Sequence, residues 1–544
     1  MSSSALWWLY ILGTGGIILV IILLLFVPRI HGLVKKGKTH KHKKSHKNAL
    51  TLSVVFAPLC TVLAALIASL GVFAGLGLTV DKQATDNTNA LNEQYTTALA
   101  GLTSGDATVR AGSISNLEII ADNWSTWPDL QKSDREIQIK AIINTLIAYL
   151  HRPIPQDSDG VYDEAEKYIR DSIAGIFQRR LVPASSNDDQ PEPSDRPTQV
   201  SSVTVLGSSA AASTDNACIM PSSVTYSLGQ WSNYALDFSH TYWNSLDLRH
   251  AVFTTKLSFS NADFLGDVHL GDVTFVDEAT FDSVTFHSDV EFSGSTFAFP
   301  AEYSPDFSFA RFFNSASFYK TVFRGGPNYS EASFSGRTDW TDAVFGAWTN
   351  FIAVAFTGYS NVFTSSHFCQ DVDFSFSNFS YSSMSMSNEI VTLFQSTYFD
   401  GKVDFSYATF FSSGVSGCRT AEFSDSIFSG EVDFTHSSFA GDGVSFESAI
   451  FLNDVDFRDS IVYGPTDIKV GMYAGILDNC GLEFVNAQFS TSIFLGGLSL
   501  AQGCMSLAHV TGLQGTVTLS EGTQIAMPNG TTHLASEGST VSFP

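Results

Sequence analysis

The chain has 544 residues, of which 29 are Lys or Arg and 54 are Asp or Glu, and its formal net charge is −25. This length allows several domains. Residues 1–49 contain eight of the basic residues and no acidic one, so the rest of the chain is strongly acidic. Such a charge disfavours nucleic acid and anionic lipid as direct partners of that part, because like charges repel.

Two uncharged apolar runs follow a short N-terminal tail of residues 1–4. They occupy residues 5–27 and 49–80. Each run is long enough, at about 1.5 Å per residue, to cross a hydrocarbon core about 30 Å thick. We therefore expect two transmembrane helices, with a lipid bilayer as a partner of the chain.

The loop between the two runs, residues 28–48, is basic. It holds eight Lys or Arg residues, whereas residues 1–4 hold none and Lys82 stands alone after the second run. The positive-inside rule places such a loop in the cytoplasm. We therefore predict a two-span protein of the cell membrane whose soluble part is extracytoplasmic. Three of the four histidines in this loop lie among its lysines, and we interpret them as part of a patch on anionic lipid and not as a metal site: His40, His42 and His46.

Residues 81–181 show the patterns of a small juxtamembrane helical domain. Ser133 and Glu136 have the spacing of a capping box, and Pro153 marks the end of the helix that they open. The apolar face of this helix is formed by Ile139, Ile142, Ile143, Leu146, Ile147 and Leu150. Similar patterns predict helices over 88–102, 106–122 and 160–181. Apolar stripes of this kind indicate packing between helices.

Part of this region resembles a known group of proteins. The stretch EQYTTALAGLTSGDATVRAGSISNLEIIA, residues 93–121, is similar to the segment that follows the membrane helices in bacterial membrane-anchored pentapeptide-repeat proteins. The residues that carry the resemblance are Thr96, Ala98, Leu99, Val109, Arg110, Gly112, Ile114, Leu117, Glu118 and Ala121. The order of segments also agrees with that group. The resemblance implies an architecture, but the group has no well-defined activity to carry over.

Residues 182–222 are rich in Ser, Pro and Asp and have few large apolar side chains, which predicts a flexible linker. One of the cysteines of the chain lies in this linker. The six cysteines show no close paired spacing: Cys60, Cys218, Cys369, Cys418, Cys480 and Cys504. We interpret them as small buried apolar residues, neither a disulfide framework nor a zinc site.

From Phe253 onward, large apolar residues recur at alternating steps of six and five residues. They are Phe259, Phe264, Leu270, Phe275, Phe281, Phe286, Phe292 and Phe297. After a break the same rhythm continues at Phe307, Phe312, Phe318, Phe323, Tyr329, Phe334, Trp340, Phe345, Phe351 and Phe356. An internal repeat of this regularity indicates a repeat architecture.

A helix fits this rhythm poorly, because rings five or six residues apart would fall on opposite helix faces. In an extended chain, a small residue and the ring two places later point to the same side. A step of five residues reverses the side, so the chain must bend after each short extended piece. Four such faces take about 20 to 22 residues, and successive coils stack by strand pairing at about 4.8 Å.

Over residues 238–500 this pattern resembles the right-handed quadrilateral β-helix of pentapeptide-repeat proteins. We therefore predict a mainly β chain, with a pentapeptide-repeat solenoid over 223–511 and a C-terminal cap and tail over 512–544. The extra residue of each six-residue step is expected at a corner. Three segments interrupt the rhythm and are predicted to be projecting loops: 380–393, 411–420 and 466–482.

The position before each ring should face outward, and it is often acidic. We predict a candidate acidic interaction surface from the four VDF triplets, at Asp373, Asp404, Asp433 and Asp456. Acidic residues in similar places are Asp306, Asp339, Glu291 and Glu422. Such rows would bind cations or imitate the charge of duplex DNA, as in pentapeptide-repeat proteins that bind gyrase, or they would only keep the surface solvated.

No pattern of residues selects a catalytic, cofactor or metal site. Histidines are scattered through the repeat region without a recurrent Ser or Cys partner: His240, His250, His269, His287, His367, His436 and His509. We therefore predict no enzyme and no cofactor. The function expected is a membrane-anchored rod with an acidic surface that scaffolds or binds another protein. Dimerisation through the rod ends, known among pentapeptide-repeat proteins, is a further option.

Two alternative functions remain open. A rod facing the cytoplasm would bind a DNA-handling enzyme by charge mimicry, which requires the opposite topology. A solenoid hydrolase or lyase would act on polysaccharide, and loss of activity at one or two carboxylates would identify it. A charge surface would instead lose its activity gradually as more carboxylates are removed.

Overall fold

The structure is a computed structural model of the chain. It describes residues 82–127, 131–183, 202–205, 218, 224–299, 303–381, 392–412, 421–440 and 444–463, followed by short strands between 482 and 543. The chain divides into two compact units, Met1–Gln94 with Trp127–Tyr149, and Tyr95–Thr126 with Leu150–Pro544. No helix formed by the described residues is long and apolar enough to cross a membrane. The predicted spans, 5–27 and 49–80, lie outside the described residues.

The four predicted helices are present. They are α3 (Lys82–Gly101), α4 (Ala107–Thr126), α5 (Lys132–Leu150) and α6 (Glu164–Leu181). The six apolar residues predicted for one face of α5 are buried. However, α5 begins at Lys132, so Ser133 lies in its first turn and is not the N-cap that the capping-box pattern predicted. The helices also do not form one separate domain, because α4 and α6 belong to the same compact unit as the solenoid.

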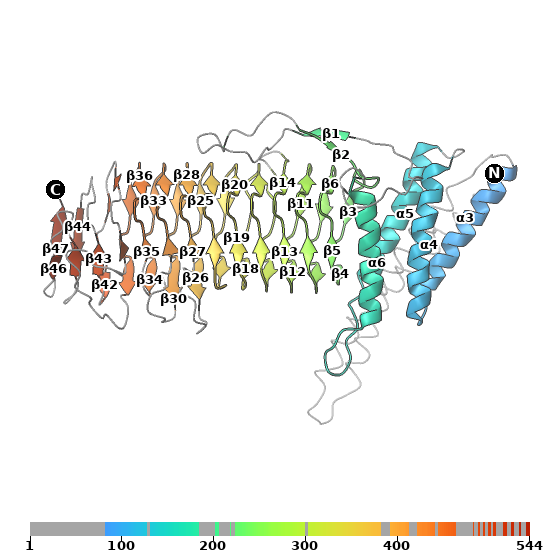
Figure 1. Cartoon of the computed structure of the whole chain (residues 1–544), viewed down its shortest axis with the longest axis horizontal. Helices are drawn as coiled ribbons and strands as arrows, with labels where there is room; N and C mark the ends of the chain where they lie inside the picture. The colour runs from blue at the N-terminus through green and yellow to red at the C-terminus, as the bar shows by residue number, and fades with distance from the viewer. Residues whose placement is uncertain are drawn as a thin grey trace, which may run out of the picture. The chain divides into compact units, whose positions relative to one another are not determined.

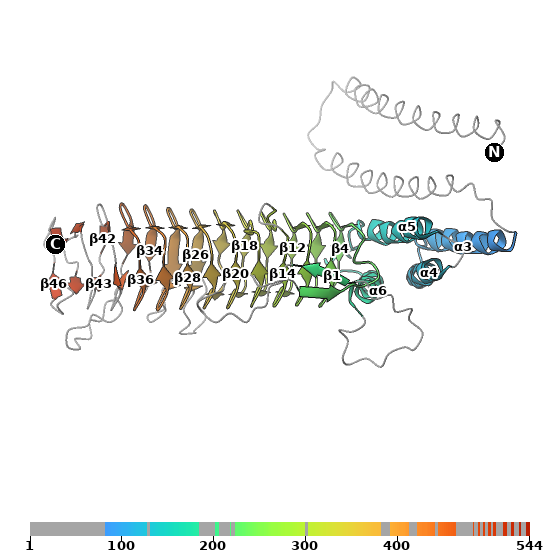
Figure 2. The same cartoon turned by 90° about the horizontal axis from the view of Figure 1, so that it is seen from above.

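Most of the second unit is a parallel β-solenoid with four faces (Figures 1 and 2). Its first turn consists of β3 (Leu236–Asp237), β4 (Tyr242–Trp243), β5 (Leu246–Asp247) and β6 (Val252–Phe253). Its second turn consists of β7 (Leu257–Ser258), β8 (Asp263–Phe264), β9 (Val268–His269) and β10 (Thr274–Phe275). Each strand pairs in parallel with the strand of the same face in the next turn. We number the faces in this order, from the first face (β3, β7) to the fourth (β6, β10).

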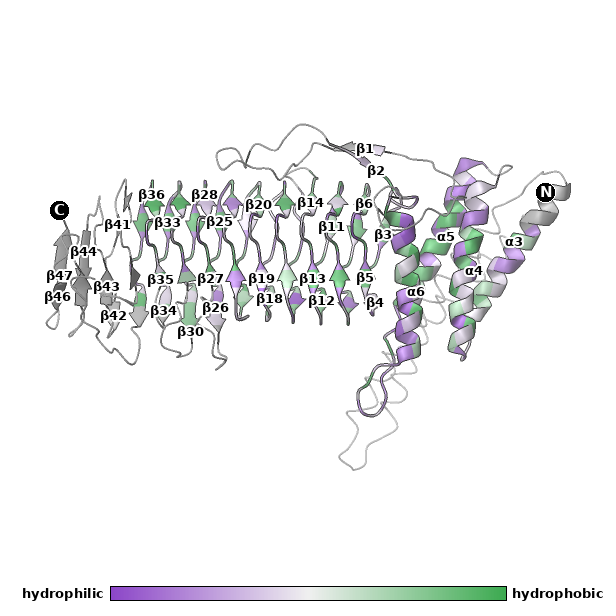
Figure 3. Ribbon diagram, in the orientation of Figure 1, coloured by the Kyte–Doolittle hydropathy of each residue, from purple (hydrophilic) through white to green (hydrophobic). Residues whose placement is uncertain are grey.

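The predicted ladder of large residues fills the interior of the solenoid. Rings on the same face stack from turn to turn: Phe281, Phe307, Tyr329 and Phe351 form one column, with centroids 4.8, 4.7 and 5.1 Å apart and planes within 10° of parallel. Rings from different faces meet edge to face, as Trp340 and Phe351 do at 5.7 Å and 89°. Such pairs add about 0.5–1.5 kcal/mol beyond the burial of their area. Hydrophobic and hydrophilic residues are interspersed along the solenoid (Figure 3).

The alternation of six-residue and five-residue steps reflects two kinds of corner. The corners that follow the first and third faces contain a residue in the left-handed region, such as Asn261, Asp272 and Ser283, with φ between 54° and 58°. Each of these residues stands two places after a large inward-facing residue and lies within a five-residue step. The extra residue of each six-residue step therefore lies at the other corners, which follow the second and fourth faces. The prediction that the sixth residue lies at a corner is thus confirmed. A turn takes 22 residues between Val273 and Ser295, 21 between Leu236 and Leu257, and 23 between Val432 and Val455.

The predicted small residues, two places before each ring, are buried, and on the second and fourth faces they lie at the corners. Some are serines and threonines, whose hydroxyl groups would be unsatisfied if they had no partner. Ser377 donates to the carbonyl of Phe351 at 2.6 Å, and Ser437 donates to the carbonyl of Phe405 at 2.7 Å. Each bond joins one turn to the preceding turn. A small polar side chain therefore serves as well as Ala or Val at this position.

Helix α6 covers the N-terminal end of the solenoid (Figure 1), an arrangement that the sequence patterns did not indicate. Phe177 packs edge-on against Phe238 and Trp243 of the first turn, at centroid distances of 5.0 and 6.2 Å. Asp171 accepts hydrogen bonds from the side chains of Asn244 and Ser245, both at 2.8 Å. The first turn has no preceding turn to stack on, so α6 supplies the missing contacts.

A buried arginine fixes α6 to the first turn. Arg170 is fully buried, and its guanidinium donates to the backbone carbonyls of Leu150, Arg152 and Tyr242. It also lies 3.4 Å from the carboxylate of Glu166. A guanidinium, with its fixed fan of N–H donors, can satisfy several carbonyls that water no longer reaches. This arginine therefore joins α6 and the segment before it to the solenoid.

Two charged residues of the stretch that resembles membrane-anchored pentapeptide-repeat proteins bind α6. Arg110 lies 3.0 Å from Glu166, and Glu118 binds Arg179 at 2.7 Å and Arg180 at 3.1 Å. Burial alone would raise the pKa of Glu118, but the hydrogen bonds and charge of the two arginines outweigh it and hold this pKa below its ordinary value. The stretch therefore contributes to the structure that covers the solenoid end.

Residues 182–222 differ from the predicted flexible linker in two places. Residues 202–205 form β1 (Ser202–Val205), which pairs antiparallel with β2 (Val224–Ser227). Cys218 is bonded to Cys369 of the solenoid. Composition alone indicated a linker because Ser and Pro dominate there, but the bordering Val-rich and Thr-rich pieces can pair as strands.

The predicted projecting loops and the C-terminal cap are described in part. The cores of the three loops, 382–391, 413–420 and 464–481, lie outside the described residues, and strand pairing resumes after each. Near the C-terminus, β45 (Gln524–Ala526) pairs in parallel with β43 (Cys504–Ser506) and antiparallel with β46 (Thr532–Leu534). The parallel ladder of this face thus meets an antiparallel strand in the region predicted to be the cap.

Candidate interaction surface

The four aspartates predicted as an interaction surface lie on the first face of the solenoid. They end strands β25 (Val372–Asp373), β29 (Val403–Asp404), β33 (Val432–Asp433) and β37 (Val455–Asp456). These strands are successive neighbours in one sheet, and their aspartates pair directly with one another. The carboxylates therefore form a column with one member per turn, at the strand spacing of about 4.8 Å. We call Asp373, Asp404, Asp433 and Asp456 the acidic row.

Each aspartate of the acidic row also shapes the corner that follows it. Its Oδ1 atom accepts a hydrogen bond, at 2.8–2.9 Å, from the backbone N–H two residues later, in Ser375, Ser406, Thr435 and Arg458. This Asx-turn leads into the left-handed corner residue. Sequence reasoning missed this role, although an Asp three residues before the left-handed corner residue is the signal for it. Local turn formation thus explains part of the recurrence of Asp.

Basic side chains of the same chain approach two carboxylates of the acidic row. Lys402 Nζ lies 3.8 Å from Oδ2 of Asp404, and the guanidinium of Arg458 contacts both oxygens of Asp456. The hydrogen bond and charge of Asp456 raise the pKa of Arg458, with a smaller contribution from Asp433. The acidic row therefore already binds two basic side chains of its own chain.

Three exposed rings run beside the acidic row. Phe376, Tyr407 and His436 are left-handed corner residues, each three places after an aspartate of the row, with φ of 59–60°. Their centroids are 4.9 and 4.6 Å apart, and their planes lie within 10° of parallel. The left-handed region is unfavourable for bulky residues, and 58% of Phe376 and 48% of Tyr407 are exposed. We call these three residues the corner ring row.

The other predicted acidic residues do not extend the row. Asp306 lies on the same face and also makes an Asx-turn, but Asn328 and Asn350 separate it from Asp373. Glu291, Asp339 and Glu422 lie on the third face, where non-acidic residues of the intervening turns separate them: Ser317, Val362 and Leu393. The continuous column of charge is therefore confined to the first face.

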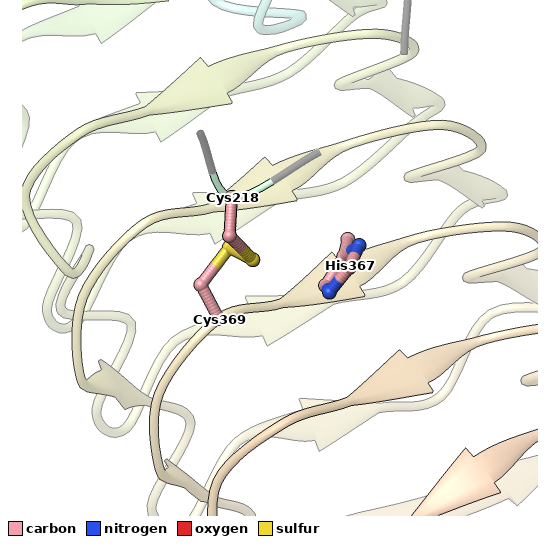
Figure 4. Close-up of side chains that lie close together, drawn as sticks. All are labelled: Cys218, His367 and Cys369. Atoms are coloured by element: carbon pink, nitrogen blue, oxygen red, sulfur yellow. A yellow bond between two sulfur atoms is a disulfide. The ribbon is translucent and has the colours of Figure 1, made fainter. Parts of the chain in front are cut away.

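The interpretation of all six cysteines as small buried apolar residues is wrong for two of them. Cys218 and Cys369 form a disulfide with a Cα–Cα distance of 5.6 Å, although 151 residues separate them (Figure 4). Cysteine spacing gave no signal, because the segment before the solenoid reaches a turn that is distant in sequence. Two residues before Cys369 is His367, which the sequence placed without a Cys partner. One ring nitrogen of His367 and the two sulfurs lie within 4.8 Å of one another.

Comparison with protein families matches residues 238–285 and 423–469 to the family described as Pentapeptide repeats (9 copies). The solenoid contains pentapeptide repeats. Both matched segments lie within it, and the second includes Asp433 and Asp456 of the acidic row. The repeats and the β-solenoid predicted from the ladder of rings are therefore confirmed. Comparisons with curated proteins and with solved structures found no match.

Proposed function

We propose that this pentapeptide-repeat solenoid is a non-catalytic, membrane-anchored surface that binds a basic segment of another protein along its acidic row. The observation that carries the proposal is the in-register column of four carboxylates beside the exposed corner ring row. An arginine-rich segment suits this surface. Its guanidinium groups pair with the carboxylates, and its aliphatic stems cover the exposed ring edges.

The mechanism is geometric and electrostatic. The solenoid holds its carboxylates at a fixed spacing, so binding does not require ordering of the surface. Because the charge is distributed over four turns, each aspartate contributes a fraction of the attraction. Binding should therefore weaken in steps as aspartates are neutralised, and it should weaken further at high salt because exposed charges are screened.

The anchoring and topology rest on separate support. The apolar runs 5–27 and 49–80 have the length of membrane spans, and the basic loop between them favours a cytoplasmic position. An extracytoplasmic solenoid is also favoured by the Cys218–Cys369 disulfide, because disulfides persist in oxidising compartments. Two unrelated features, loop charge and a sulfur–sulfur bond, thus support the same topology.

The binding proposal is tested by neutralising the row while preserving its corners. In a variant with Asp373→Asn, Asp404→Asn, Asp433→Asn and Asp456→Asn, each Asn side-chain oxygen can still accept the corner hydrogen bond. We expect an oligoarginine peptide to bind the full-length wild type and to lose at least about tenfold in affinity for this variant, since each lost ion pair weakens binding by up to about 1 kcal/mol. Fluorescence anisotropy of a labelled peptide measures the loss.

A matched control removes the same charge from the opposite face. It carries Asp247→Asn, Glu291→Gln, Asp339→Asn and Glu422→Gln, all on the third face. We expect the control to retain most of the wild-type affinity. Equal losses in both variants would show that the peptide responds to net charge alone, and the acidic row would then have no special role.

Topology is tested in intact cells. One tag is placed after Pro544 and another within loop 28–48, and external protease is added. We expect digestion of the C-terminal tag alone. Protection of the C-terminal tag together with cleavage of the loop tag would reverse the proposed topology and make a cytoplasmic partner the one to seek.

A further inference from the structure

We propose that Cys218, Cys369, His367 and Asp400 form a zinc site when the disulfide between the two cysteines is reduced. His367 lies in β24 (His367–Phe368), and Asp400 follows β28 (Tyr398–Phe399) of the next turn. The two strands pair in register, so Cys369 and Asp400 occupy equivalent positions on neighbouring turns. The solenoid thus supplies three of the four donors, and the segment before the solenoid supplies the fourth.

The distances between the donor atoms are close to those of a tetrahedral zinc site. The His367 Nε2 and Asp400 Oδ2 atoms are 2.9 Å apart, and Cys218 Sγ lies 3.3 Å from the same Oδ2. Zinc bonds of about 2.0–2.3 Å place tetrahedral ligands about 3.3–3.8 Å apart. Small side-chain rotations would therefore bring the four atoms around one ion.

The nature and burial of the donors favour zinc over harder cations. Two thiolates, one imidazole and one carboxylate match the ligands that zinc takes, whereas calcium and magnesium prefer oxygen alone. The side chain of His367 is only 11% exposed, and its ring stacks on Tyr398 at a centroid distance of 5.3 Å. The imidazole is therefore held in place before any metal arrives. Asp400 is 42% exposed, which leaves a route for the ion.

The disulfide and the metal exclude each other. The two sulfurs are bonded, and ligands of one zinc ion cannot lie at bonding distance from each other. A phosphine reductant cleaves the S–S bond, takes oxygen from water to become the phosphine oxide, and leaves one proton on each sulfur. Zinc then displaces these two protons as it binds the two thiolates. In either state, Cys218 stays fastened to the same turn of the solenoid.

The test measures the two cysteines directly. The full-length protein is reduced with a phosphine, titrated with zinc and treated with iodoacetamide, and alkylation is read at each cysteine by mass spectrometry. We expect zinc to slow alkylation of Cys218 and Cys369 by about tenfold or more, because a metal-bound thiolate is a poor nucleophile. Residue-level reading separates this site from metal bound by the histidines of loop 28–48. Equal alkylation with and without zinc would overturn the proposal.

The chain offers a matched control for the histidine. His287 pairs with Asp263 at 3.1 Å and stacks on Phe313 at 5.3 Å, much as His367 pairs with Asp400 and stacks on Tyr398. We expect His367→Ala to raise the zinc concentration that protects the two cysteines from alkylation by at least about tenfold. We expect the same of Asp400→Asn, a substitution at a more exposed position. His287→Ala should leave this concentration unchanged. Protection that survives both site substitutions, or that His287→Ala weakens equally, would refute the four-residue site.

Discussion

The middle of the solenoid and its N-terminal end solve the same packing problem in different ways. In the middle, Phe351 stacks between Tyr329 and Phe374, at centroid distances of 5.1 and 4.8 Å. At the end, Phe238 stacks on Phe259 on one side only, and Phe177 of α6 packs edge-on against it. Arg170 and Asp171 of α6 bind polar groups of the first turn at this end.

This difference shows that repeated local contacts stabilise the middle of the solenoid, whereas long-range contacts stabilise its end. Within the repeat, each turn is the partner of the next, so a short sequence pattern specifies both surfaces of the contact. At the end, the partner must come from a different element, and its fit depends on individual residues. Substitutions should therefore be more damaging at the end than in the middle, and the following predictions test that expectation.

The largest effect is expected for Arg170→Met. The substitution leaves three backbone carbonyls and the buried Glu166 without the guanidinium, and breaking a buried ion pair costs about 3–5 kcal/mol. Urea unfolding of the full-length chain, with hydrogen exchange to locate the loss in α6 and the first turn, measures it. Arg337→Met is the control, because the Arg337 side chain is 49% exposed and its ion pair with Asp339 is long, at 3.5 Å. This substitution should lower the free energy of unfolding by less than about 1 kcal/mol. Equal losses would contradict the special role of the end.

A smaller effect, dependent on pH, is expected for Glu118→Gln. The arginines of α6 hold the pKa of Glu118 below its unfolded value, so its stabilisation is present above the unfolded pKa and is lost as pH falls through the folded pKa. We expect the variant to be less stable by about 2 kcal/mol at neutral pH, and the difference to shrink in acid. Urea titrations over a pH series measure it. A difference that grows as the pH falls would have the wrong sign. The control Glu136→Gln, 3.8 Å from Lys132, should change stability by less than about 0.5 kcal/mol at neutral pH.

In the middle of the solenoid, Phe351→Leu should cost about 1–2 kcal/mol. Leucine retains most of the buried volume but loses stacking on both neighbouring turns. Urea unfolding measures the change, and Phe376→Leu on the exposed corner ring row is the control, with an expected change below about 0.5 kcal/mol. If Phe351→Leu were as damaging as Arg170→Met, the middle would be no more tolerant than the end.

The smallest effects separate the two roles of the acidic row. Asp433→Ala removes the acceptor of the corner hydrogen bond and should cost about 1 kcal/mol, whereas Asp433→Asn keeps the acceptor and should stay within a few tenths of a kcal/mol. Thermal or urea unfolding of both variants measures this. If Asn destabilised the solenoid as much as Ala, the charge and not the acceptor would support the corner.

The repeat region could be predicted closely because its signal is local. The spacing of rings from Phe259 to Phe356 implied the faces, the inward side chains and the extra residue at alternate corners. The acidic row was also visible in sequence, but the role of its aspartates as acceptors in the Asx-turns was not. This role depends on the left-handed corners, whose φ values the ring spacing alone does not specify.

The long-range contacts could not be predicted in this way. Nothing in the spacing of Cys218 and Cys369 indicated a bond, and nothing around Arg170 indicated that its partners would include Tyr242. These pairs are 151 and 72 residues apart in sequence. No periodic pattern connects them, because each is a single contact between different elements.

The sequence by itself determined the ladder of rings, the four-sided coil and the column of aspartates, since a repeated pattern brings equivalent positions of successive turns together. Only the tertiary structure decided that α6 covers the first turn, that Arg110 and Glu118 bind α6, and that Cys218 meets Cys369 beside His367 and Asp400. The physical reason is the same throughout: stacking is specified by residues one turn apart, whereas the cover and the cysteine cluster depend on where distant segments pack.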